Sequence, residues 1–143
     1  MQSANAYSAQ VRLLGLVAVG GAAGCLVRYA IHLLTNWDVL LAPSFPWPTL
    51  LINVSGCLII GAASVFIAGR KRELQWRALI VTGFLGGFTT FSALALETVA
   101  LLDSGLHLAA LGYLAATLIL GALAVSAGVR LAGLRQARVG PVR

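Results

Sequence analysis

The chain has 143 residues, of which 59% are hydrophobic and only 10% are charged, with a formal net charge of +6. A typical soluble domain carries about 25% charged residues, so this composition excludes a soluble globular protein and indicates an all-α integral membrane protein. Little chain remains for a soluble catalytic domain, and no catalytic constellation is visible, so we expect no enzyme. A membrane-spanning helix needs about 20 apolar residues. The sequence predicts four in one transmembrane domain, 1–143, over residues 11–34, 48–68, 78–102 and 106–129.

The basic residues favour one side of this topology. Of the ten lysines and arginines, every one except Arg28 lies at the very start of the first span, between the second and third, or after the fourth. The positive-inside rule makes that side cytoplasmic, so both termini are expected inside a multi-pass protein of the cell inner (plasma) membrane. Anionic lipid headgroups account for the basic clusters, and no nucleic-acid partner is expected.

The first span carries Gly20, Gly24 and Arg28 at successive i+4 positions, hence on one helix face. The Gly-x-x-x-Gly spacing permits close approach of another helix. Arg28 lies near the outer end of this span. It either snorkels to the outer headgroups, lines an outer vestibule that attracts anions, or pairs with Glu97 at a similar depth.

The second span contains Asn53, about one and a half turns inside its outer end. A buried amide must find hydrogen-bond partners. Two interpretations stay open: Asn53 makes an interhelical hydrogen bond, or its NH₂ group donates to a permeating anion.

The third span is interrupted at its centre by residues 82–92, TGFLGGFTTFS, which combine glycines, hydroxyls and aromatic rings. A broken helix inside a membrane is tolerated only where it is buried in protein or lines a wet cavity. We therefore expect the third helix to be broken at mid-membrane and the ion or substrate site to lie there. Glu97, later in the same span, is an intramembrane carboxylate and hence a functional candidate.

The fourth span places Tyr113, Thr117 and Gly121 on one narrow face at i, i+4 and i+8. Helix packing alone explains this face, or it forms a hydroxyl track beside a pore. The tail after Val129 is polar and basic, and we expect it to fray.

Three segments together resemble the Fluc (CrcB) family of fluoride channels: residues 20–29, GGAAGCLVRY; residues 46–56, PWPTLLINVSG; and residues 82–92, followed by Glu97. The resemblance covers nearly the whole chain. It implies an antiparallel dimer of four-helix subunits with two fluoride pores. It also implies passive export of cytoplasmic fluoride down its electrochemical gradient, as fluoride detoxification.

The resemblance further implies a sodium ion at the dimer centre, held by the backbone carbonyls of Gly86 and Thr89. Fluoride is small and tightly hydrated, so a pore must replace its water with amide, hydroxyl and ring-edge contacts. None of these is a full charge, which lets an ion enter and still leave. The predicted pore residues are Asn53, Phe91, Ser92, Thr90, Tyr113, Thr117 and, at the vestibule, Arg28. Leu94 departs from the family pattern, which usually has a second phenylalanine there.

Two alternatives to the channel differ in their chemistry. A proton-coupled small multidrug exporter would use Glu97 as its carboxylate. A non-transporting assembly subunit would pack on larger membrane partners. The one-sided charge distribution also predicts a single orientation in the membrane. The antiparallel partner is then either a second copy of the chain or an oppositely oriented homologue.

Overall fold

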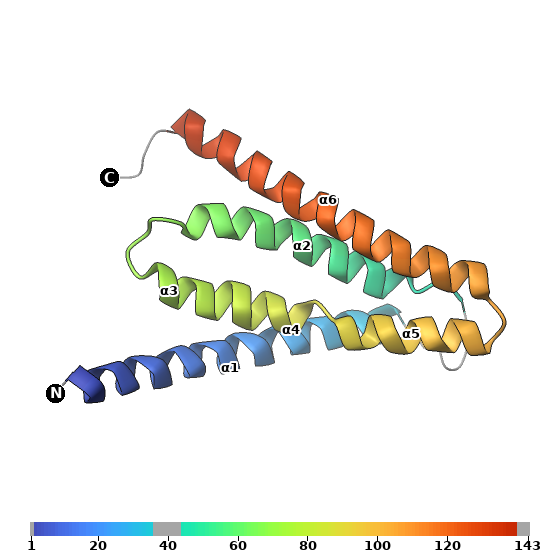
Figure 1. Cartoon of the computed structure of the whole chain (residues 1–143), viewed down its shortest axis with the longest axis horizontal. Coiled ribbons are helices and arrows are strands. Elements are labelled where there is room, and N and C mark those ends of the chain that lie inside the picture. The colour runs from blue at the N-terminus through green and yellow to red at the C-terminus, as the bar shows by residue number, and fades with distance from the viewer. Residues whose placement is uncertain (1, 36–43, 140–143) are drawn as a thin grey trace.

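The structure is a computed structural model that describes residues 2–35 and 44–139, and these form an elongated helical bundle (Figure 1). The N-terminal end of α1, the C-terminal end of α6 and the turn between α2 and α3 lie at the same end of the bundle. Its elements are α1 (Gln2–Thr35), α2 (Trp47–Ile67), α3 (Glu73–Trp76), the π-helical segment η1 (Arg77–Leu85), α4 (Gly86–Phe88), α5 (Phe91–Asp103) and α6 (His107–Val139).

Four helical stretches of the described chain are long and apolar enough to cross a membrane, which makes this a multi-pass membrane protein. The third stretch is composite, because it runs through α3, η1, α4 and α5. The four stretches are Tyr7–Thr35, Trp47–Ile67, Glu73–Asp103 and His107–Ala137.

The turn between α2 and α3 is built from local backbone and carboxylate contacts. Gly69 adopts a positive φ of 73°, which glycine tolerates without strain. The Glu73 carboxylate accepts a hydrogen bond from the Gly69 N–H at 2.8 Å and another from Arg77 Nε at 2.9 Å. These contacts connect the turn to the beginning of the third span.

The helices pack as two pairs, and the third span changes partners along its length. α1 packs against η1 and α4, whereas α2 packs against α6. After the interruption between α4 and α5, α5 packs against α6 instead of α1. The interruption therefore carries the chain from one helix pair to the other.

Glycines bring the backbones of α1 and the third span into direct contact. A Cβ added at Gly24 would collide with the Phe84 carbonyl, and one at Gly20 would collide with the Leu79 carbonyl. Gly87 sits in the same way against the backbone of Gly21. The close approach expected from the Gly-x-x-x-Gly spacing is therefore present.

A second glycine interface joins α2 to α6. A Cβ at Gly61 would collide with the Val125 carbonyl, and one at Gly128 would collide with the Leu58 carbonyl. The sequence does not indicate this interface, because Gly61 and Gly128 lie far apart in the chain.

α6 is longer than expected, since it continues as helix past Val129 to Val139 instead of fraying. Gln136 Nε2 donates to the Val65 carbonyl at 3.1 Å, which ties the extension to α2. Alanine, leucine and arginine, which are frequent in this stretch, are also good helix formers.

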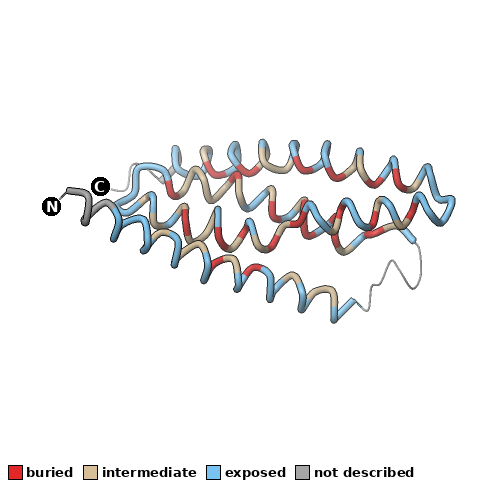
Figure 2. Tube along the Cα trace, turned by 60° about the horizontal axis from the view of Figure 1, so that its bottom comes forward, coloured by how far each residue is buried: buried red, intermediate tan, exposed pale blue. Residues whose placement is uncertain are grey.

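Buried positions recur along the helices between exposed ones (Figure 2). A core cluster joins α2, α5 and α6 through Leu50, Leu94, Leu101, Ala110 and Tyr113. The remaining surface is rich in large apolar side chains, as expected of a surface that contacts lipid or a partner subunit.

Candidate functional site

The third span is interrupted at Thr89 and Thr90. Both residues have extended backbones, with ψ values of 156° and 127°. Thr90 caps the next helix, because its Oγ1 accepts a hydrogen bond from the Ala93 N–H at 3.1 Å. That Oγ1 also lies 3.2 Å from the Ser92 hydroxyl oxygen. The 82–92 run thus contains an interruption, and its position at mid-membrane stays a prediction.

Asn53 of α2 binds the interruption at two points. The Thr90 N–H donates to Asn53 Oδ1 at 2.8 Å, and Asn53 Nδ2 donates to the Thr90 carbonyl at 3.0 Å. Asn53 is only 6% exposed. Water does not reach this position, so the Asn53 amide satisfies the Thr90 backbone groups instead. Asn53 therefore makes the interhelical hydrogen bond that one of the two interpretations expected. Its NH₂ group has a second N–H, which can donate to another acceptor.

Because the chain is extended at Thr89 and Thr90, the last carbonyls of the preceding helix need hydrogen-bond donors from outside that helix. In a continuous α-helix the Thr90 N–H would donate to the Gly86 carbonyl. Because that N–H donates to Asn53, the Gly86 carbonyl loses its regular donor. The next carbonyl, that of Gly87, accepts from Arg28 Nε at 3.2 Å and from Cys25 Sγ at 3.5 Å.

Glu97 is bound by two hydroxyls and not by Arg28. The Thr49 hydroxyl donates to Glu97 Oε1 at 2.7 Å, and the Tyr113 hydroxyl donates to Oε2 at 2.5 Å. All three side chains are buried, with Glu97 5% exposed. The ion pair between Arg28 and Glu97 that the sequence left open is therefore absent. α1 packs against η1 and α4, which places Arg28 at Gly87 instead.

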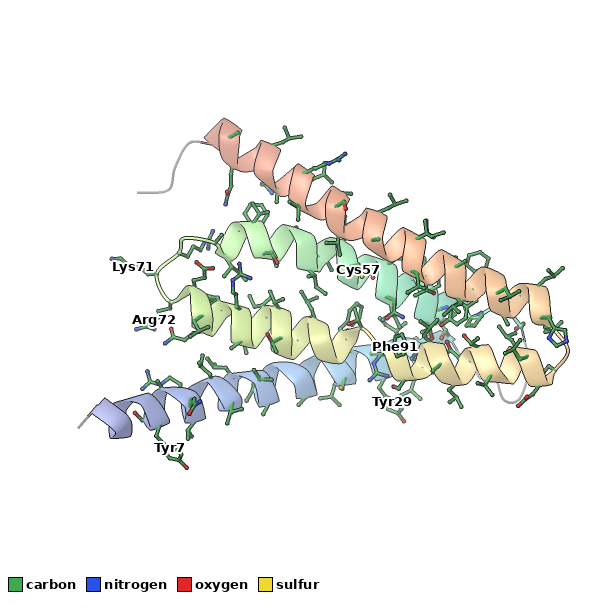
Figure 3. All side chains as sticks on the ribbon, viewed as in Figure 1. Tyr7, Tyr29, Cys57, Lys71, Arg72 and Phe91 are labelled. Atoms are coloured by element: carbon green, nitrogen blue, oxygen red, sulfur yellow. The ribbon has the colours of Figure 1, made fainter. Side chains whose placement is uncertain are left out.

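An open groove of about 330 Å³ lies along α2, α5 and α6 beside the interruption. Figure 3 shows the labelled Cys57 on α2 and Phe91 at the start of α5. Asn53, Thr90, Phe91 and Thr117 line the groove among the predicted pore residues. The other lining residues are Cys57, Thr89, Leu94, Leu118, Gly121, Ala122 and Val125.

The other three predicted pore residues lie outside the groove lining. Tyr113 is fully buried and its hydroxyl is held by Glu97, Ser92 faces the Thr90 hydroxyl, and Arg28 lies on α1. The Thr117 hydroxyl donates to the Tyr113 carbonyl at 2.9 Å within α6. Phe91 is 75% exposed in the single chain.

Thr49 is not among the predicted site residues, although its spacing from Asn53 gives a signal for it. Thr49, Asn53 and Cys57 follow one another at i+4, so they share the face of α2 that meets the third and fourth spans. These small or polar residues, at helical spacing, form one stripe with Asn53.

Within residues 2–35 and 44–139, no group of three or more His, Cys, Asp or Glu side chains is placed to hold a metal ion. Backbone oxygens are also present at the interruption, among them the Gly86 carbonyl that has lost its regular donor. Carbonyl oxygens are the ligands that alkali-ion sites in channels use.

Comparison with known proteins gives a consistent assignment. A family model described as "CrcB-like protein, Camphor Resistance (CrcB)" matches residues 15–129. The chain is 46% identical over 116 residues to a fluoride-specific ion channel FluC of Rhizobium leguminosarum bv. trifolii, covering 80% of this chain and 90% of the relative. For FluC of Paracoccus denitrificans the identity is 42% over 113 residues, covering 79% and 88%. For FluC 2 of Bacillus licheniformis it is 45% over 105 residues, covering 73% and 75%.

Proposed function

The chain belongs to the CrcB family, and we propose that it is a fluoride-selective channel that lets fluoride leave the cytoplasm passively. The family is one of channels and not of enzymes. We assign the relatives' activity to this chain because the matches cover nearly the whole length of those relatives. A negative-inside potential drives the anion outward, at about 2.3 kcal/mol per charge per 100 mV.

The observation that carries the proposal is the groove beside the interrupted helix. It combines the Asn53 amide and the Thr90 and Thr117 side chains with the Phe91 ring. One N–H of the Asn53 amide binds the Thr90 carbonyl, and the second can donate to an anion in the groove. The positive edge of the Phe91 ring provides a weak further contact. These neutral donors replace water around fluoride without holding it too tightly.

A second subunit completes this pore in our proposal. The groove is open along one side, and Phe91, which lines it, is mostly exposed in the single chain. An antiparallel partner would cover the groove and exclude lipid from its polar residues. The pore would then lie at mid-membrane, in the cell inner membrane, with both termini cytoplasmic.

A sodium ion at the dimer centre fits the backbone chemistry of the interruption. The carbonyls of Gly86 and Thr89 would hold it, since the Gly86 carbonyl has lost its helical donor to Asn53. A bound cation supplies positive charge where oxygen dipoles gather. The chain's own part is to present these carbonyls, which it does by extending the backbone at Thr89 and Thr90.

The environment of Glu97 argues against the multidrug exporter. A proton and substrate site needs a carboxylate that its ligand can reach, whereas both Glu97 oxygens already accept hydrogen bonds in a buried position. This environment is that of a structural carboxylate that joins α2, α5 and α6.

Fluoride efflux from liposomes tests the proposal. Purified protein is reconstituted into liposomes loaded with potassium fluoride. A potassium ionophore lets potassium leave with the fluoride, so that no opposing potential builds up, and a fluoride electrode records the flux. We expect rapid efflux from the wild type, no efflux of chloride, and a large loss for Asn53→Ala. Protein-free liposomes set the leak. Wild-type efflux at the rate of that leak would overturn the assignment and favour the non-transporting subunit.

A further inference from the structure

The helical segment 73–88 ends against α1. Beyond Phe88 the backbone is extended, so the last carbonyls of this segment lose the N–H donors that a continuing helix would offer. The Gly87 carbonyl is satisfied by α1 alone, through Arg28 Nε at 3.2 Å and Cys25 Sγ at 3.5 Å. Arg28 Nη2 lies 3.7 Å from the same sulfur, so the two α1 donors also contact each other.

The glycines of α1 make this contact possible. Gly24 has no Cβ where the backbone of Phe84 and Phe88 passes, and a Cβ there would collide with both residues. Arg28 is one helical turn beyond Gly24 on the same face. The close approach at Gly24 therefore delivers the Arg28 side chain to the Gly87 carbonyl.

The charge of Arg28 suits this position. A guanidinium stays protonated in proteins, and a cation at the C-terminal end of a helix is favourable because carbonyl dipoles point toward it. Arg28 is half-buried, so water does not fully replace its contact with Gly87.

We infer that Arg28 is a positioning residue that caps the interrupted third span, and not a charge that attracts anions to a vestibule. By holding the end of α4 against α1, it fixes where the chain becomes extended. Thr90 then reaches Asn53, whose amide lines the groove. The inference deepens the proposed function and rests on it where ion flux is the readout.

Three substitutions separate a hydrogen-bond donor from a charge. In Arg28→Gln, the amide nitrogen stands at the same number of bonds from Cα as arginine Nε, so the donor to Gly87 is kept and the charge is lost. In Arg28→Met, a methyl group takes that place and both are lost. In Arg28→Lys, the charge is kept and the donor moves one atom further out.

Fluoride efflux of these variants from liposomes is the first measurement. For a cap, we expect Arg28→Gln to retain most of the wild-type flux. We expect Arg28→Met to lose about tenfold or more, because the half-buried Gly87 carbonyl keeps only the weak donor Cys25 Sγ. For an electrostatic attractor, Gln and Met would be equally poor and only Lys would conduct, with a wild-type advantage that disappears at high salt. That second pattern would overturn the inference.

Amide hydrogen exchange over residues 86–92 is the second measurement, and it needs no flux. We expect exchange there to be faster in Arg28→Met than in the wild type, and unchanged in Arg28→Gln. Equal exchange in all variants would refute the cap even if the protein conducts nothing, whereas a silent wild type in liposomes refutes only the proposed function. If Arg28→Met does not fold, the comparison of Gln with Lys decides, since a cap predicts that Gln conducts at least as well as Lys.

Discussion

The buried carboxylate of Glu97 allows a quantitative test of the packing between α2, α5 and α6. Tyr113→Phe removes only the hydroxyl that donates to Glu97 Oε2 at 2.5 Å, and both side chains are buried. A buried acceptor that loses its donor costs about 1–3 kcal/mol, so we expect the free energy of unfolding to fall by that amount. Thr49→Val, which removes the donor to Oε1 with little change of shape, should have an effect of similar size.

Unfolding of the purified protein in mixed detergent micelles, titrated with a denaturing detergent and followed by circular dichroism, measures this free energy. Tyr29→Phe is the matched control, because Tyr29 is 61% exposed and its hydroxyl has no such role. For that control we expect a change within about 0.5 kcal/mol. If Tyr113→Phe were as mild as Tyr29→Phe, the hydroxyl would not be a ligand of Glu97, and the reasoning would fail.

Three further predictions concern helix contacts and topology. Gly24→Ala should destabilise the protein by about 1–3 kcal/mol, because the added Cβ collides with backbone atoms. Gly15→Ala, whose Cβ would meet nothing within 4 Å, should be neutral or mildly stabilising. Melting curves in detergent compare the two variants. Gln136→Ala should increase hydrogen exchange near the end of α6, because the bond to the Val65 carbonyl is lost, and unchanged exchange would contradict that anchor. Reporter fusions at the C-terminus should signal only from the cytoplasm; equal signals from both sides would refute a single orientation.

The pattern of spans and glycines could be predicted because each is a property of one helix. Apolar length predicts the spans, and the i+4 spacing of Gly20, Gly24 and Arg28 places them on one face whatever lies opposite. The interruption near Thr89 and Thr90 could be expected from the same kind of local signal, since glycine and hydroxyl residues break the regular apolar pattern.

The partners across helices could not be predicted in this way. Arg28 and Glu97 were expected at similar depth, but depth does not say which helices touch. α1 contacts the part of the third span before the interruption, whereas Glu97 lies after it, beside α2 and α6. The contact between Gly61 and Val125 depends in the same way on which helix pairs form.

The sequence also did not predict the π-helical winding of η1 or the helical extension of α6. π-helical winding is rare, and no local residue signal in 77–85 indicates it. The extension of α6 is stabilised by a contact with α2, which is distant in the sequence.

The exchange of partners in the third span has a consequence for biosynthesis. α1 and α2 leave the ribosome first, yet α1 packs mainly on η1 and α4, and α2 mainly on α6, the last helix to be made. Until the chain has been translated past Thr90, Asn53 lacks the backbone groups that satisfy its amide. Both early helices therefore wait for their main partners, and the bundle can close only when the nascent chain is almost complete.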